Sequence, residues 1–479
     1  MSESLPEISL PSFSLVSEET KEAFRIVYSL LSDLTSELPI SYVDTFLVLQ
    51  VLEAYYEPWK APPAPKMSTV ISHVQVGLFR HYARFASAAY GWKLLYGLSI
   101  IGGPADVARC MTDSVAGDHE VIMKHTGIPE DAIRDYVMPA EITQPSFLLL
   151  RDDATESLVV SIRGTMSIAD SVTDLVCKPV PFLSGYAHEG MLTSAQWFMD
   201  EYLDTLTAEL AACPDGYSLE IVGHSLGAGI AILLALLLDE HLPHLDVHAT
   251  AFAPPCVLSP SLADLPRTQR LVDSIVNGAD FVSCLSLGSV ERLRALIVLV
   301  AQRSNHSKLE RIVSLFKSAS YQTNPVSMAE KLGLPTNDSD ADADADADAD
   351  PAAASSSNTA ADPAATTDDN DSANSSVYEL HLEAMEELEQ GEQDSASRVL
   401  IPGGRMFHIF KLPSEPHHGI AHIGPEYYQH IRVRSNMFAS HMPNAYEAAI
   451  QDVLLFYSRT VGPQKDSLLV KAVDSAVPK

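Results

Sequence analysis

Residues 219–229 read LEIVGHSLGAG, and the predicted fold follows from this segment. Residues 219–222 are mostly apolar, as in a buried strand, and the apolar run from Leu226 to Glu240 has the length of a helix. Between them, residues 223–227 fit the pattern G-x-S-x-G. The glycines permit a tight turn from strand to helix. The stretch therefore predicts a sheet that presents the hydroxyl of Ser225 at its carboxyl edge.

The residues around this turn alternate between strand-like and helical patterns. Two β-rich runs at 147–151 and 158–163 flank the turn residues 152–155 and predict a hairpin. Further strand-like runs lie at 219–222, 247–252, 271–276 and 428–433, and helical patterns lie at 192–213, 226–240, 290–302 and 445–458. Such alternation predicts an α/β domain with a largely parallel central sheet. In that setting the serine turn is the nucleophile elbow of an α/β-hydrolase fold.

Composition divides the rest of the chain. Residues before Val137 show mostly helical patterns, for example at 18–38 and 76–96, with a Pro-rich break at 57–65. An alternating Asp/Ala tract, Ser339 to Asp350, lies in a polar segment that lacks the apolar residues of a core and is predicted to be disordered. The expected organisation is a helical region (1–137), a first part of the hydrolase core (138–304), an acidic disordered insert (305–397), a second part of the core (398–462) and a tail (463–479).

The charge balance excludes some partners and compartments. The chain carries 31 Lys and Arg against 63 Asp and Glu, and 18 of those acids lie between Thr336 and Ser397. A net charge of −32 argues against nucleic acid as a partner. Five scattered cysteines, an acidic start and the lack of a long apolar run predict a cytoplasmic protein that is neither secreted nor membrane-spanning.

A serine hydroxyl needs a general base, and the base needs a carboxylate to orient it. In α/β-hydrolases the chain order is serine, acid, histidine. Asp280 follows the strand-like run 271–276 and is favoured as the acid over Asp273, which lies inside that run with its side chain committed to one face of the sheet.

The histidine is less sharply indicated. His441 is predicted to lie in a loop, after the strand-like run 428–433 and before Pro443, which can open a helix, but position alone does not separate it from His430. His417, His418 and His422 have the appearance of a metal cluster. They lie in a Pro- and Gly-containing stretch without a Cys or an acid at ligand spacing, so a solvated loop is favoured and no metal site is predicted.

An oxyanion requires two hydrogen-bond donors. The backbone N–H of Leu226, the residue after the serine, is one candidate. The segment 163–165, at the end of a predicted strand, is a candidate for the second, although it also fits a simple hairpin end.

Several motifs, taken in order, resemble the class 3 lipases, and within that family the sn-1-specific diacylglycerol lipases. They are VSIRGT at 160–165 with Asp170 and Asp174, HEG at 188–190, residues 222–229, AFAPP at 251–255, VNGAD at 276–280 and SHMP at 440–443. The resemblance covers about residues 75–304 and 398–460. It implies Ser225 as nucleophile, Asp280 as acid, His441 as base, Thr165 and Leu226 as oxyanion donors, and a lid near Met166 to Asp174.

The resemblance also implies an activity. It predicts a serine lipase that cleaves the sn-1 acyl ester of diacylglycerol to 2-monoacylglycerol and a fatty acid, through an acyl-enzyme on Ser225. A triacylglycerol lipase, a phospholipase A1 and a non-catalytic lipid-binding scaffold remain alternatives. The chemistry requires no cofactor, and calcium is implied by the resemblance alone. The expected partners are a glycerolipid substrate and a membrane surface that the protein binds peripherally.

Overall fold

The structure is a computed structural model that describes residues 18–34, 40–56, 71–98, 114–138, 144–165, 179–303, 399–412 and 416–460. The predicted lid and the predicted acidic insert lie outside these residues. The chain divides into two compact units. One comprises Met1–Leu38, Trp59–Arg294 and Asp394–Lys479, and the other comprises Pro39–Pro58 and Ala295–Gln393.

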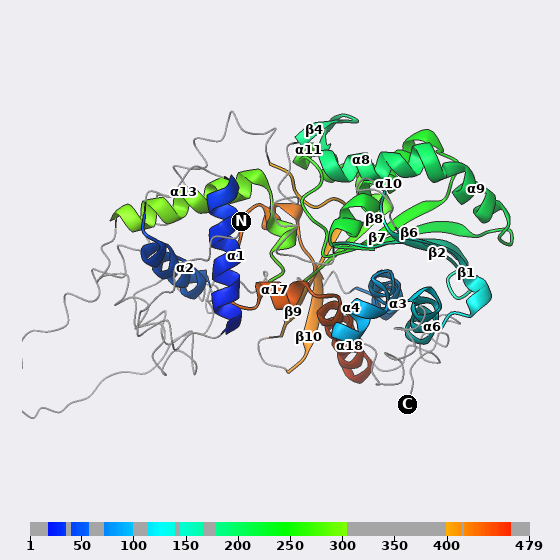
Figure 1. The fold of residues 1–479 in the computed structure, drawn as a ribbon, viewed down its shortest axis with the longest axis horizontal. Coiled ribbons are helices and arrows are strands. Elements are labelled where there is room, and N and C mark those ends of the chain that lie inside the picture. Colours follow the sequence, from blue (N-terminus) through cyan, green and yellow to red (C-terminus); the bar gives the residue numbers. More distant parts are fainter. Residues whose placement is uncertain are drawn as a thin grey trace, which may run out of the picture. The chain divides into compact units, whose positions relative to one another are not determined.

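The first unit is built on an eight-stranded sheet with the order β1-β2-β3-β6-β7-β8-β9-β10 (Figure 1). Strands β3, β6, β7, β8 and β9 run parallel to one another, and β1, β2 and β10 add antiparallel edges. The strands are β1 (Ile133–Val137), β2 (Phe147–Asp152), β3 (Ser157–Ile162), β6 (Ser218–His224), β7 (Val247–Phe252), β8 (Val272–Asn277), β9 (Arg405–Lys411) and β10 (His418–His422). This largely parallel sheet confirms the predicted fold class.

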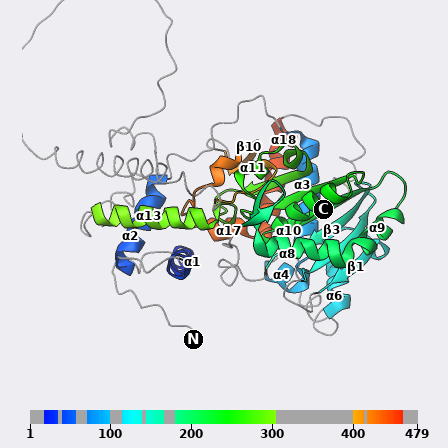
Figure 2. The same ribbon diagram turned by 90° about the horizontal axis from the view of Figure 1, so that it is seen from above.

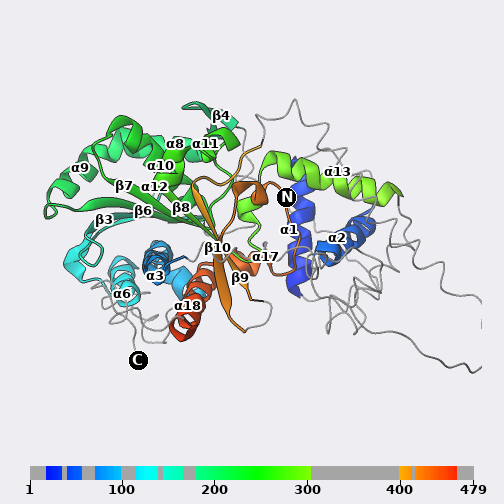
Figure 3. The same ribbon diagram turned by 180° about the vertical axis from the view of Figure 1, so that it is seen from behind.

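Helices cover both faces of the sheet (Figures 1 and 3). One face carries α3 (His73–Ala88), α6 (Ser114–Thr126) and α18 (Pro443–Thr460), with α4 (Gly91–Gly97) after α3. The other carries α10 (Leu226–His241), which packs against α8 (Glu189–Trp197), as Figure 2 shows from above. A π-helical turn, η4 (Phe198–Tyr202), joins α8 to α9 (Leu203–Ala211).

Shorter elements complete the first unit. They are η3 (Glu130–Ala132), the hairpin β4 (Pro179–Phe182) and β5 (Gly185–His188), α11 (Pro260–Ala263), α12 (Pro266–Leu271), η5 (Val282–Cys284), η8 (Pro425–Tyr428) and α17 (Met437–His441). The first unit also includes α1 (Glu18–Leu34). In the second unit, α2 (Tyr42–Tyr56) is preceded by Ser41, whose hydroxyl accepts a hydrogen bond from the backbone N–H of Asp44. Helix α13 (Leu287–Arg303) begins in the first unit and ends in the second.

The central helix α10 is apolar around its whole circumference. Every residue from Gly227 to Leu238 is buried, as expected for a helix enclosed between the sheet and other helices. No helix in the described part of the chain is long and apolar enough to cross a membrane.

The predicted hairpin of residues 147–163 is confirmed, because β2 and β3 pair in antiparallel register. The predicted strand at 428–433 is wrong. The segment leaves the short helix η8 and continues without regular structure. Its apolar alternation reflects single buried side chains: Tyr428 lies in the interior, where its hydroxyl contacts Nδ1 of His408 at 2.9 Å.

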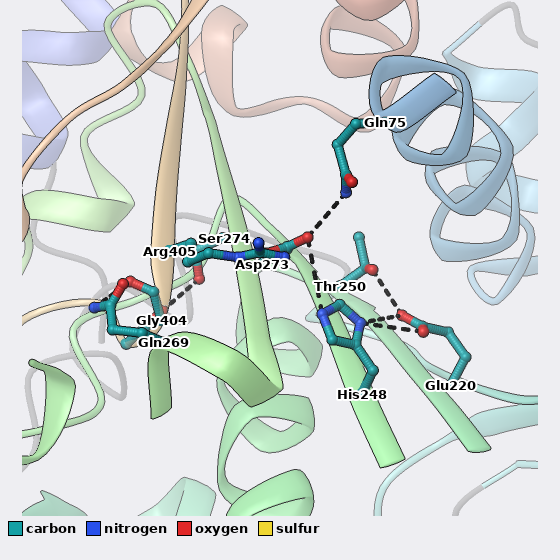
Figure 4. A network of polar contacts seen from close by, with 10 residues as sticks. Gln75, Glu220, His248, Thr250, Gln269, Asp273, Ser274, Gly404 and Arg405 are labelled. Carbon is teal, nitrogen blue, oxygen red and sulfur yellow. Dashed lines mark hydrogen bonds and ion pairs between the residues drawn. The ribbon is translucent and has the colours of Figure 1, made fainter. Parts of the chain in front are cut away.

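Polar side chains form a band across the amino-terminal ends of the parallel strands (Figure 4). In strand order, the charged ones are Glu220 on β6, His248 on β7, Asp273 on β8 and Arg405 on β9. The distances are 3.2 Å from Glu220 Oε2 to His248 Nδ1, 3.8 Å from His248 Nε2 to Asp273 Oδ2 and 2.7 Å from Asp273 Oδ1 to Arg405. When His248 is protonated, the charges of these side chains therefore alternate in sign across four neighbouring strands. The attraction between opposite charges offsets the desolvation cost of burying the side chains.

Candidate active site

Ser225 lies at the carboxyl end of β6 in a strained backbone conformation, with φ 58° and ψ −126°. Such dihedrals are unfavourable for a residue other than glycine and are held by the surrounding structure. The backbone N–H of Ser225 donates to the carbonyl of Phe252 on β7 at 3.0 Å. A Cβ atom at Gly223 would clash with the backbone of Gly227, so the elbow requires glycine at Gly223. These contacts fix the serine between strand and helix, as the sequence predicted.

His441 and Asp280 complete a hydrogen-bonded relay with Ser225. Nε2 of His441 lies 3.0 Å from Oγ of Ser225, and Nδ1 lies 3.0 Å from both carboxylate oxygens of Asp280. A carboxylate only accepts, so Nδ1 carries the proton and Nε2 is free to accept from the serine hydroxyl. All three residues are buried. Their geometry matches the nucleophile, base and acid arrangement of serine hydrolases.

Asp280 is held in its charged form by several donors. Burial would raise the pKa of this carboxyl, but the charge and hydrogen bond of His441 and further hydrogen bonds outweigh burial and lower it below its usual range. Those further donors are the hydroxyl of Tyr446, 2.6 Å from Oδ2, and the backbone N–H of Val282, 2.9 Å from Oδ1. Asp280 therefore stays ionised and can stabilise an imidazolium at His441.

Asn277, the last residue of β8, joins the loop of the acid to that of the base. The side-chain amide of Asn277 donates to the backbone carbonyl of Ser440 at 3.1 Å. The backbone carbonyl of Asn277 accepts from the backbone N–H of Asp280, also at 3.1 Å. His441 ends the short helix α17, where the sequence predicted a loop, and α18 starts at Pro443 as predicted. The side chain of Asn277 thus ties the loop of the acid to the loop of the base.

The loop at 163–165 lies directly against the elbow. Ile162, the last residue of β3, is paired with Gly223, and a Cβ at Gly164 would lie 3.2 Å from Cβ of Ser225. Leu226 opens α10, and the first N–H groups of a helix have no partner within it. The structure therefore brings the loop of Thr165 and the N–H of Leu226 to the same edge as Ser225.

The rival residues lie elsewhere. Asp273 faces His248 and Arg405 in the polar band, and the hydrogen bond to Ser225 is made by His441, not His430.

The predicted solvated loop at 417–422 is wrong, because residues 418–422 form β10. An acid also accompanies these histidines: Nδ1 of His417 and Nδ1 of His418 lie 2.8 and 2.7 Å from the carboxylate of Asp452. Sequence spacing missed Asp452 because it projects from α18.

Tyr446 is a site residue that the sequence analysis missed. It lies in the first turns of α18, five positions after His441, and no motif marks it.

No group of three or more His, Cys, Asp or Glu side chains suited to a metal ion occurs within the described ranges.

The fold and this relay together define an α/β-hydrolase fold with a serine, histidine and aspartate site. Residues 159–289, which include Ser225 and Asp280, match the family described as Lipase (class 3). Diacylglycerol lipase-beta of Mus musculus is 35% identical over 251 residues, covering 48% of this chain and 36% of that protein. Diacylglycerol lipase-alpha of Homo sapiens is 29% identical over 271 residues, covering 50% of this chain and 26% of that protein.

The chain thus spans about a third or less of the length of these two relatives. The family match and the two diacylglycerol lipases confirm the predicted resemblance to class 3 lipases. Among solved structures, the Rhizomucor miehei triacylglyceride lipase is similar with a TM-score of 0.36 and 21% identity, covering 45% of this chain and 76% of that chain.

Proposed function

We propose that this protein is a serine lipase that hydrolyses the sn-1 acyl ester of diacylglycerol, giving 2-monoacylglycerol and a free fatty acid. The single observation that carries the proposal is the hydrogen-bonded relay from Asp280 through His441 to Ser225. A serine hydroxyl is a weak nucleophile at neutral pH, and a neighbouring imidazole that can accept its proton removes that limitation.

The relay supports a two-step reaction. Oγ of Ser225 attacks the ester carbonyl carbon while Nε2 of His441 takes the hydroxyl proton, and Asp280 stabilises the resulting imidazolium. His441 then gives that proton to the oxygen of the leaving glyceride as the C–O bond breaks. Water, deprotonated by His441, then attacks the acyl carbon of the acyl-enzyme; the bond from that carbon to Oγ of Ser225 breaks, His441 returns the proton to Oγ, and the fatty acid is released. The oxyanion formed in each step would accept from the N–H of Leu226 and from Thr165.

Diacylglycerol is favoured as the substrate by the relatives named diacylglycerol lipase. The relay itself fixes the reaction and not the head group, so a triacylglycerol lipase or a phospholipase A1 would use the same three residues. The substrate resides in a bilayer, so we also propose that the protein binds membrane surfaces peripherally. In the described segments, Cys213 and Cys256 are free thiols, which favours a reducing, cytoplasmic setting.

A panel of purified glycerolipids tests the substrate. The purified protein would be incubated with mixed micelles of diacylglycerol, triacylglycerol or phosphatidylcholine that carry different acyl chains at each position. We expect release of the sn-1 chain of diacylglycerol to be the fastest reaction, and preferred release from either other lipid would contradict the head-group assignment. A Ser225→Ala variant serves as the control, since equal turnover by that variant would favour a scaffold without this chemistry.

A further inference from the structure

His224, the residue before the proposed nucleophile, makes two hydrogen bonds that join three segments of the site. Its Nε2 lies 2.8 Å from the backbone carbonyl oxygen of His441, and its Nδ1 lies 2.9 Å from the hydroxyl oxygen of Tyr90. The ring is buried and also packs beside the ring of His441, with the centroids 4.9 Å apart. His224 therefore bonds to the backbone of the proposed base and not to its imidazole nitrogens, which face Ser225 and Asp280.

The partners of His224 fix which nitrogen carries its proton. A backbone carbonyl only accepts hydrogen bonds, so Nε2 of His224 is the protonated nitrogen. Nδ1 then holds a lone pair and accepts from the hydroxyl of Tyr90. Burial, and then the charge of His441, lower the pKa of His224 to about 3, which keeps the ring neutral and in this one tautomer at physiological pH.

Tyr90 extends the chain of hydrogen bonds to the loop at 163–165. The backbone N–H of Gly164 donates to the hydroxyl oxygen of Tyr90, whose ring lies edge-on to His224. A Cβ atom at Gly164 would clash with this hydroxyl and with the carbonyl of His224, so the approach requires glycine. Tyr90 itself lies between α3 and α4, outside every motif that the sequence analysis identified.

On the basis of the proposed function, we propose that His224 and Tyr90 are positioning residues for catalysis. The ring of His224 fixes the backbone of His441 to the elbow, and Tyr90 fixes the candidate oxyanion loop to the same ring. The distances from Ser225 to its base and to its oxyanion donors are thereby set by one connected network. Displacing a catalytic group by about 1 Å can slow a reaction on the order of 100-fold, so the network is expected to affect turnover more than substrate binding.

Steady-state kinetics on a soluble short-chain ester, p-nitrophenyl butyrate, test this proposal. We expect His224→Phe, which keeps a ring but removes both hydrogen bonds, to lower kcat by about 100-fold with KM changed less than about threefold. His224→Gln retains one donor and one acceptor and is expected to recover at least about a tenth of the wild-type kcat. Tyr90→Phe is expected to lower kcat by about 10-fold, with less than additive loss when combined with His224→Phe.

Matched controls separate positioning from folding. His241→Gln removes a ring that also bonds a backbone carbonyl, that of Leu237, but at the far end of α10, and Tyr217→Phe removes a hydroxyl that contacts Asp153. Both are expected to keep the wild-type kcat. A folded His224→Phe protein with wild-type kcat would overturn the proposal, and if that variant fails to fold, wild-type kcat in Tyr90→Phe would overturn it.

A measurement that requires no activity separates this proposal from the proposed function. In ¹⁵N-histidine NMR spectra, His224 should appear as the neutral Nε2–H tautomer from about pH 5 to pH 8, and Tyr90→Phe should shift its Nδ1 signal. A protonated ring or the Nδ1–H tautomer would overturn the network. A wild-type protein with the expected spectrum but no esterase activity would instead refute the proposed function, and with it the catalytic part of the positioning role.

Discussion

The hydroxyl of Tyr446 donates to Oδ2 of Asp280 at 2.6 Å and accepts from the backbone N–H of Asn277 at 3.0 Å. One phenol thus links the proposed acid to the strand end from which its loop departs. Burial, and then the charge of Asp280, raise the pKa of Tyr446 well above its usual range, so the phenol keeps its proton and remains a donor at neutral pH.

The substitution Tyr446→Phe tests that link. It leaves a buried carboxylate with one donor fewer and the N–H of Asn277 without its acceptor, so we expect a loss of about 2 kcal/mol in the free energy of unfolding. We also expect kcat to fall about 10-fold because Asp280 is less firmly oriented. Denaturant unfolding and ester hydrolysis measure the two effects. Tyr217→Phe is the control, and a Tyr446→Phe protein that matches it in both measurements would refute the link.

The carboxylate itself can be tested against its rival. Asp280→Asn removes the charge opposite His441 and favours the wrong tautomer, so kcat is expected to fall about 10⁴-fold while the protein remains folded. Asp273→Asn alters the polar band and is expected to reduce stability with kcat unchanged. The reverse pattern, with activity lost only in Asp273→Asn, would show that the acid has been assigned to the wrong strand end.

The packing around Gly227 predicts that no larger residue is tolerated at this position. A Cβ atom there would clash with the carbonyl oxygen of Ile162 and lie 2.9 Å from the carbonyl carbon of Arg163. We expect Gly227→Ala to cost about 1–3 kcal/mol of stability and to reduce activity, although alanine favours helices. The control is Gly77→Ala in α3, where a Cβ has no neighbour within 4 Å, so a gain of up to about 1 kcal/mol is expected. Equal effects of the two variants, measured by thermal unfolding, would contradict this account.

The polar band predicts a pH dependence of stability. Burial lowers the pKa of His248, but the charge and hydrogen bond of Glu220 outweigh burial and raise it above its ordinary value of 6.5. Protonated His248 therefore stabilises the native state below about pH 6.5, and this contribution is lost as the pH rises through the folded-state pKa.

The substitution His248→Gln isolates this effect. We expect the variant to be less stable than the wild type by about 1 kcal/mol at pH 6, with a smaller difference at pH 9. Denaturant unfolding across that pH range measures it, and His241→Gln provides the histidine control. A difference that stays constant or grows with pH would show that His248 is not protonated in the native state.

Local patterns were sufficient to predict the core of this protein. The strand, the elbow and the apolar helix α10 are contiguous, so residues 219–240 alone predict both the fold and the position of Ser225. Asp280 was predictable because it follows β8 within a few residues. The choice of His441 over His430 as the general base depended on the family resemblance, because no local sequence feature distinguishes the two histidines.

Contacts between distant segments could not be predicted. Tyr446 and Asp452 project from α18, and their partners lie on other elements, so no spacing in the sequence reveals them. The false strand at 428–433 arose for the same reason. Its apolar residues are buried one by one against the fold, and their alternation imitates the period of a strand.

Labelling with a fluorophosphonate probe, followed by peptide mass spectrometry, shows whether Ser225 is an activated nucleophile. If the relay of Asp280, His441 and Ser225 activates the serine, the wild-type protein will carry the phosphonyl adduct on Ser225, and a folded His441→Gln variant will react slower by a factor on the order of 10³ or more. An adduct on another residue, or equal labelling rates in the two proteins, would contradict the account.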